Sequence, residues 1–167
     1  MIIGSANRFA QAAGGGGGSL PARNDVNVTN VFNGVYTSGG QTISSNSEDP
    51  GENVYEAFDN DQFTFWGALA NDFPNLAVID FGSAQVVYSV CFTPRVVVNM
   101  QFYVDSSDDN LNWTERLGLT SASSSANPPP DQFFDLDTPA EARYWRVRVI
   151  SSTSQNRARV ANIFFRS

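Results

Sequence analysis

Three side chains with oxygen atoms stand close together in the first half of the chain. Asp59, Asp61 and Thr64 are spaced i, i+2 and i+5 within one short polar segment. Carboxylate, hydroxyl and backbone carbonyl oxygens are the ligands that Ca²⁺ prefers in proteins, so this spacing indicates a calcium loop. A second interpretation stays open, in which Asp59 and Asp61 are turn residues whose carboxylates accept hydrogen bonds from nearby backbone amides.

The sequence offers few residues of the types that catalysis requires. The chain has no histidine, which removes the commonest general base, the commonest zinc ligand and the Ser-His-Asp and Cys-His arrangements. Its single cysteine, Cys91, lies in an apolar segment, and this position predicts a buried and unreactive thiol. We therefore predict that the protein is not an enzyme.

The charge and hydropathy of the chain exclude two classes of partner. The net charge of the 167 residues is −7, and all ten basic residues are arginine. An acidic chain lacks the electrostatic surface that binds phosphate backbones, so we expect no nucleic acid partner. No apolar run approaches the length that spans a bilayer, and the residues after Met1 lack the pattern of a signal peptide.

The first 24 residues differ from the rest in composition. They include five consecutive glycines, Gly14 to Gly18, and such a segment loses too much backbone entropy to become ordered alone. We predict an extended Gly-rich tail over residues 1–24, which anchors the protein to other subunits of an assembly, and a folded domain over residues 25–167. A second interpretation stays open, in which the Gly-rich segment is a flexible linker.

From Val26 onward, short apolar or alternating runs are separated by Gly, Pro, Asn, Asp and Ser, and this texture predicts β-structure. One short helix is expected near Tyr55 to Phe58, and a surface loop over Ser121 to Pro130. Several strands separated by turns indicate an antiparallel β-sandwich or jelly roll. The predicted strands are Asn33 to Tyr36, Leu76 to Phe81, Val86 to Thr93, Met100 to Ser106, Gln132 to Leu136, Tyr144 to Ser151 and Val160 to Phe165.

Five segments in order resemble motifs of the discoidin family, also called the coagulation factor 5/8 type C domain, within the galactose-binding-like superfamily. Together they span about residues 40 to 165, and the resemblance implies an antiparallel β-sandwich with binding loops at one end. The segments are Thr42 to Ser45, Ala57 to Trp66, Leu76 to Gly82, Tyr103 to Trp113 and Ala142 to Val147.

In this family the loop that matches Asp59 to Thr64 binds a structural calcium ion. The resemblance implies that Ca²⁺ is a cofactor here too. Many calcium-binding relatives have glutamate where this chain has Asn162, and the loss of one charge weakens binding without abolishing it. The implied ligands are the Glu56 carbonyl, Asp59, Asp61, Thr64, the Ala161 carbonyl and the Asn162 side chain.

The resemblance also implies which loops recognise a ligand: residues 45–53, 67–75, 94–100 and 153–159. Sugar-binding relatives often use a histidine, which this chain lacks. Trp66 and Trp113 are expected in the core, and Arg143 and Arg146 are expected to pair within the sheet. Asp105, Asp108 and Asp109 match an exposed hairpin and not a catalytic cleft. The candidate ligand-binding residues in the loops are Asn71, Asp72, Phe73, Arg95, Asn99, Arg157 and Arg159.

Two hypotheses for function follow. The first is a non-catalytic virion-associated protein of a phage or virus, whose tail joins neighbouring subunits in an oligomeric assembly while its sandwich presents a receptor- or carbohydrate-binding surface. The alternative is a freestanding bacterial carbohydrate-binding lectin or adhesin. The first places the protein in a virion, and the second places it outside the cell or at the cell surface, with a cell-surface carbohydrate as its partner.

Overall fold

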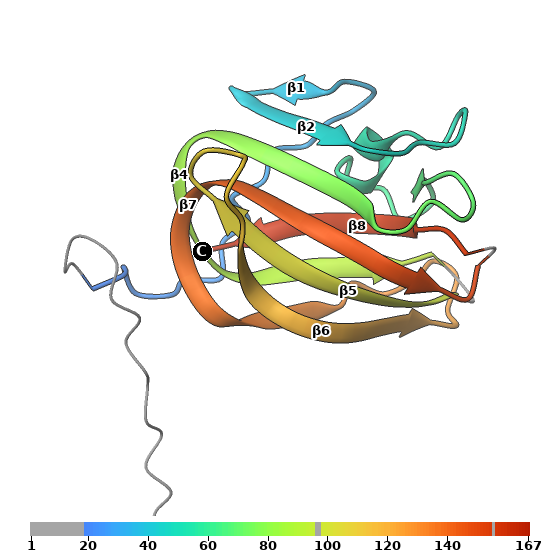
Figure 1. The fold of residues 1–167 in the computed structure, drawn as a ribbon. Coiled ribbons are helices and arrows are strands. Elements are labelled where there is room, and N and C mark those ends of the chain that lie inside the picture. Colours follow the sequence, from blue (N-terminus) through green and yellow to red (C-terminus); the bar gives the residue numbers. More distant parts are fainter. Residues whose placement is uncertain (1–18, 96–97, 155) are drawn as a thin grey trace, which may run out of the picture.

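The computed structural model of the chain describes residues 19–95, 98–154 and 156–167 (Figure 1). Nearly all of its regular structure is antiparallel β-sheet, with one short 3-10 helix, η1. The elements are β1 (Thr37–Ser38), β2 (Gln41–Ser45), η1 (Val54–Ala57), β3 (Trp66–Gly67), β4 (Asn75–Pro94), β5 (Val98–Ser107), β6 (Thr114–Ser124), β7 (Phe133–Ser152) and β8 (Arg159–Arg166).

Two long strands, β4 and β7, run through both layers of a sandwich. Their first pairing joins the start of β4 to the end of β7, within the strand order β1-β2-β4-β7-β5-β6. Their second pairing joins the end of β4 to the start of β7, and there β4 also pairs with β8, whose other edge meets β3. The pairing register shifts between Asp80 and Gln85, where Gly82 has a φ of 76°. The predicted antiparallel β-sandwich is therefore confirmed.

The core lies between these two layers and is rich in aromatic side chains. Phe92 of β4 stacks on Phe102 of β5, with ring centroids 4.1 Å apart. On β7, Trp145 and Val147 are fully buried whereas the intervening Arg146 is half-buried. This is the two-residue period of a strand that covers a core with one face.

Some strand predictions were wrong at their ends. The segment Asn33 to Tyr36 is a turn, with Gly34 at a φ of 67°, and the strands follow it as β1 and β2. The predicted loop from Ser121 begins too early, because β6 continues to Ser124. The short helix predicted near Tyr55 is present as η1.

The two ends of the described chain lie side by side. The Asn24 amide donates to the Ser167 carbonyl at 3.1 Å, and the Ser167 amide donates to the Val26 carbonyl at 3.0 Å. Arg23 also forms an ion pair with Asp135 at 2.7 Å. The last residues of the predicted tail thus pack against the domain, while residues 1–18 lie outside the described part. No helix in the described residues is long and apolar enough to cross a membrane.

Candidate functional site

The predicted calcium loop brings three oxygen atoms together around the Thr64 hydroxyl. The Thr64 Oγ1 atom lies 2.8 Å from Asp59 Oδ2, 2.9 Å from the Asp61 carbonyl and 3.4 Å from the Glu56 carbonyl. One hydroxyl has one hydrogen to donate, so it cannot satisfy three acceptors at once. The cluster therefore has an excess of lone pairs, which is the environment that a hard cation stabilises.

The turn interpretation of the same residues is also realised. Asp59 Oδ1 accepts a hydrogen bond from the Asp61 amide at 2.9 Å, and Asp61 Oδ1 accepts one from the Phe63 amide at 2.9 Å. These are Asx-turn contacts, and each uses one carboxylate oxygen. Because Asp59 turns its second oxygen toward Thr64, the turn and a cation site are compatible.

Asn162 on β8 has an amide oxygen that suits the same role. Its Nδ2 donates to Asp131 Oδ1 at 2.9 Å, while its Oδ1 is buried without a hydrogen-bond partner. Gln62 of the predicted calcium loop donates to the same Asp131 oxygen at 3.3 Å, which ties the loop to β8. Ala161, beside Asn162, is fully buried. A buried acceptor without a donor is costly unless a cation or water approaches it.

The electrostatics of the predicted calcium loop agree with this arrangement. Burial raises the pKa of Asp59, because its charged form is partly desolvated. In the described residues no three acidic, cysteine or histidine side chains gather, so carbonyl, hydroxyl and amide oxygens must complete the ligand set. Calcium accepts such mixed oxygen ligands, and the predicted residues fit it. The sequence did not indicate that Asp131 accepts hydrogen bonds from both Gln62 and Asn162, because Asp131 lies far from both residues along the chain.

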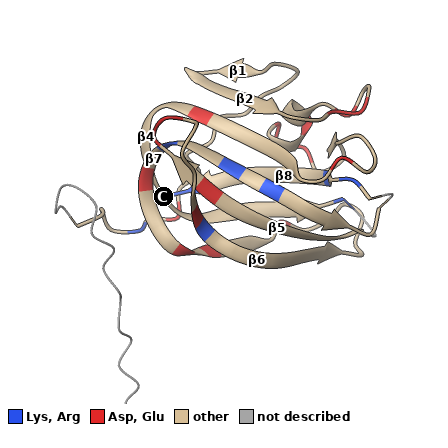
Figure 2. Ribbon diagram, in the orientation of Figure 1, with Lys and Arg blue, Asp and Glu red and all other residues tan. Residues whose placement is uncertain are grey.

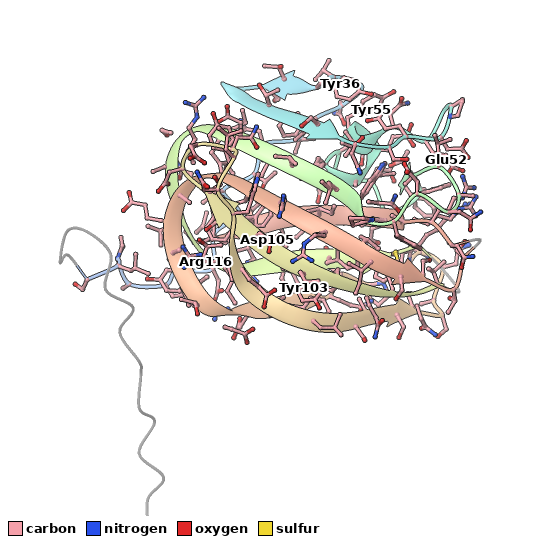
Figure 3. All side chains as sticks on the ribbon, viewed as in Figure 1. Tyr36, Glu52, Tyr55, Tyr103, Asp105 and Arg116 are labelled. Carbon is pink, nitrogen blue, oxygen red and sulfur yellow. The ribbon has the colours of Figure 1, made fainter. Side chains whose placement is uncertain are left out.

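At the end of the sandwich where β8 begins, Arg157 connects several loops. It is only 7% exposed, it forms an ion pair with Asp49, and its Nη1 lies 3.4 Å from Glu52 Oε2. Figure 2 shows basic and acidic segments at this end, and Figure 3 labels Glu52 there. Because Arg157 is buried and paired, we assign it a structural role in place of the ligand contact that the sequence suggested.

Arg95 and Arg159 lie next to each other on the same side of the molecule. The Arg95 amide donates to the Arg159 carbonyl at 2.9 Å. The guanidinium carbon of Arg95 lies 3.7 Å from the centroid of the Phe65 ring, and that of Arg159 lies 5.5 Å from it. Arg159 also reaches Glu52 Oε1 at 3.4 Å. The guanidinium of Arg95 has no hydrogen bond or ion pair within the described part of the chain, unlike the other arginines described there.

Positive charge exceeds negative charge in what we call the loop-end arginine cluster: Arg95, Arg157, Arg159, Asp49 and Glu52. Burial lowers the pKa of Arg159, and repulsion from Arg157 and Arg95 acts in the same direction. The Nε atoms of Arg157 and Arg159 are buried without acceptors. Three guanidinium groups thus face two carboxylates, and the cluster has more hydrogen-bond donors than acceptors.

The loop over residues 67–75 places its candidates differently. Asn71 is exposed, with a φ of 61°, and its side-chain oxygen accepts a hydrogen bond from Asn156 Nδ2 at 3.1 Å. Asp72 is also exposed. Phe73 is partly buried and packs against the core, which leaves less of its ring exposed than a free stacking surface would have. Asn71 and Asp72 remain available to a ligand.

Asn99 precedes Met100, whose sulfur accepts a hydrogen bond from the Arg159 amide at 3.5 Å. Asn99 lines a groove of about 470 Å³ over the ends of β5, β6 and β7, while Arg95 contacts Phe65 next to β3. The groove residues are Asn99, Met100, Gln101, Ser121, Ala122, Ser123, Ser151, Ser152 and Thr153, none of them charged. The structure therefore does not place Asn99 in the loop-end arginine cluster.

Other residues that the sequence singled out have structural roles. Trp66 is fully buried as predicted, but Trp113 is half-exposed beneath the Arg146 guanidinium, 4.2 Å from the ring centroid. Arg143 pairs with Asp80 at 2.7 Å, as expected. Burial raises the pKa of Cys91 to about 12, so the thiol is protonated at neutral pH.

The expectation for Asp105 was wrong. Asp105 is buried and is not part of an exposed hairpin. Arg146 and Arg148 both donate hydrogen bonds to its carboxylate. Figure 3 labels Asp105 on β5, which pairs with β7 at this position. Asp108 and Asp109 are exposed, as expected.

Solved structures of carbohydrate-binding modules share this fold. A pectin-binding module matches with 18% identity, a TM-score of 0.63, and coverage of 75% of this chain and 89% of that chain. The family 32 module of NanJ from C. perfringens, in complex with galactose, matches with 20% identity, a TM-score of 0.63, and coverage of 77% and 94%. A mutant of chitosan-binding module 1 from a Paenibacillus sp. IK-5 chitosanase/glucanase matches with 17% identity, a TM-score of 0.67, and coverage of 86% and 100%.

A search of curated protein sequences gave no match. The model of one protein family, described as the F5/8 type C domain, matches residues 41–163. That match spans most of the chain and includes both the predicted calcium loop and the loop-end arginine cluster. The chain therefore belongs to the F5/8 type C domain family.

Proposed function

We propose that this domain is a non-catalytic carbohydrate-binding module that binds a saccharide at the loop-end arginine cluster. Family membership supports a binding role, and the similar structures named above are modules that bind pectin, galactose and chitosan. These relatives favour the lectin hypothesis over a virion component, which has no support among them. Fold similarity alone does not fix the ligand, so the proposal depends on the site.

Arg95 is the observation that carries the proposal. Its guanidinium stacks on Phe65, and no described residue accepts a hydrogen bond from it. A planar cation held in this way presents its N–H groups in a fixed direction, where they can donate to ligand oxygen atoms. The exposed Asn71 and Asp72 lie in a neighbouring loop and add polar groups.

We further propose that the predicted calcium loop has a structural role. Asp59, Asp61 and Thr64 would hold Ca²⁺ together with the Glu56 carbonyl and Asn162. A bound ion would supply the positive charge that balances their lone pairs. The orphaned Asn162 oxygen and the crowded Thr64 hydroxyl support this proposal.

A glycan array with matched variants tests the saccharide proposal. The unchanged protein is expected to bind a subset of glycans, and Arg95→Ala is expected to lose this binding while keeping its melting temperature. Arg143→Ala removes the same charge from an exposed pair with Asp80 and should bind as the unchanged protein does. Equal binding by all three proteins would place the ligand elsewhere, and a blank array would contradict the proposal.

A further inference from the structure

We propose that the saccharide bound at the loop-end arginine cluster carries a carboxylate, so that the ligand class is polysaccharides containing uronic acids. This inference rests on the proposed function and specifies it. It is drawn from the charge, geometry and aromatic content of the site.

The charge of the cluster is opposite to that of the whole chain. The chain has a net charge of −7, yet within the cluster three arginines contact two carboxylates, Asp49 and Glu52, while Glu48 and Asp72 lie elsewhere in the same loops. Burial is the main cause of the lowered pKa of Arg159; Glu52 opposes this shift, and repulsion from Arg157 and Arg95 adds to it. An anionic ligand group would relieve that repulsion, whereas a cationic sugar would increase it.

The geometry of Arg95 suits a carboxylate. The guanidinium carbon lies 3.7 Å from the centroid of the Phe65 ring, and no described residue accepts a hydrogen bond from the N–H groups of this side chain. Two parallel N–H groups match the two oxygens of a carboxylate, and such bidentate pairs are stronger than neutral hydrogen bonds. Arg159, beside it, has a buried Nε without an acceptor and adds to the excess of donors.

The site has little to offer a neutral sugar ring. Neutral pyranoses are commonly held by an open aromatic face, and the four candidate loops contain a single aromatic residue, Phe73. Phe73 packs against the core, and the face of Phe65 is covered by Arg95. Recognition here must therefore depend on charge and hydrogen bonds more than on stacking.

Isothermal titration with three saccharides of different charge tests the inference. The ligands are a galacturonate oligomer, a neutral galactose oligomer of the same length, and dextran sulfate as a sulfated polyanion. The unchanged protein is expected to bind the galacturonate oligomer at least tenfold more tightly than the neutral one. Arg95→Ala should weaken galacturonate binding roughly ten- to hundredfold, the range for hydrogen bonds to charged groups.

Two further variants separate charge from geometry. Arg95→Lys keeps the charge but loses the planar fork, so it should restore only part of the affinity. Arg143→Ala removes an arginine that pairs with Asp80 at 2.7 Å and should leave the affinity unchanged. Binding of galacturonate should also weaken as salt increases, because exposed charges are screened.

The outcomes distinguish this inference from the proposed function. Equal affinity for the neutral and acidic oligomers, lost in Arg95→Ala, would keep the saccharide site and overturn the uronate inference. Equal binding of dextran sulfate would show a general polyanion surface, which also overturns it. Galacturonate binding that is unaffected by Arg95→Ala would place the carboxylate at another surface. Absence of binding to all three ligands would contradict both proposals.

Discussion

At the scale of single residues, Asp59 uses its two carboxylate oxygens for different purposes. Its Oδ1 fixes the backbone turn at the Asp61 amide, while its Oδ2 faces Thr64. The spacing of Asp59, Asp61 and Thr64 in the sequence was enough to predict a cluster of oxygens. The sequence could not show Asn162 with an unpaired buried oxygen, because that depends on how β8 packs against the loop.

Calcium should stabilise the protein through Asp59. A ligand that binds only the folded state raises stability with its concentration, by about 2.7 kcal/mol at one hundred times its Kd. We expect the melting temperature to rise with added Ca²⁺ and to fall with a chelator. Asp59→Asn should lose this response, whereas Asp72→Asn, an exposed loop change, should keep it. If neither calcium nor chelator changes the melting temperature, hydrogen bonds alone hold the loop.

The calcium response should depend on pH through the same residue. In the absence of metal, the folded-state pKa of Asp59 lies above its ordinary value of 3.8, so the folded protein holds this proton more tightly than the unfolded chain. The contribution of Asp59 to the stability of the metal-free protein therefore falls as the pH rises from 3.8 through the raised pKa. Calcium needs the charged form, so the calcium-induced shift should disappear as pH falls through the raised pKa. Melting curves at several pH values, with and without calcium, would measure this, and a shift independent of pH would contradict it.

Replacing Arg157 should cost much more stability than replacing Arg143. Removing Arg157 leaves Asp49 without its ion pair and Glu52 with Arg159 alone, so Arg157→Met should cost about 3 kcal/mol. Arg143→Met, in an exposed pair, should cost about 1 kcal/mol or less. Chemical denaturation measures both. Similar small losses for the two variants would mean that Arg157 is not holding the loops.

At the scale of elements, alternation of residues predicted the strands that border the core. The sequence could not show that two pairs of predicted segments join into the single strands β4 and β7, because the bends between them depend on cross-strand pairing. It also missed β6, whose exposed positions combine Leu119 with polar residues and whose buried residues include Leu117 and Ala122. An edge strand with one solvated face gives a weak hydropathy signal.

The bend in β4 should depend on Gly82. Its φ of 76° is unfavourable for other residues, and an added Cβ would lie 2.7 Å from the Gly40 carbonyl oxygen. We expect Gly82→Ala to destabilise the fold by about 1–3 kcal/mol. Gly118→Ala in β6 meets only side-chain atoms, 3.4 Å or more away, and should change stability by about 0.5 kcal/mol or less. Equal denaturation midpoints for the two variants would contradict this account of the bend.

At the scale of the whole molecule, the acidic chain brings three of its arginines together at one end, among the acidic residues of the neighbouring loops. The sequence predicted which loops belong to that end but not how their charges pair. The contacts of Arg157 with Asp49 and of Asn71 with Asn156 join residues far apart in the chain. Because these contacts cannot be read from the sequence, Arg95, Arg157 and Arg159 were all predicted to bind the ligand. In the structure, Arg157 and Arg159 form ion pairs with carboxylates, whereas Arg95 stacks on Phe65.

Chemical-shift mapping by NMR is the most direct test of the central claim that a saccharide binds beside Arg95. The ¹⁵N-labelled protein would be titrated in turn with galacturonate and galactose oligomers, while the backbone amides and arginine Nε signals are followed. We expect the changes to centre on Arg95, Arg159 and Phe65. Changes confined to the uncharged groove around Asn99, or no changes with either oligomer, would contradict the claim.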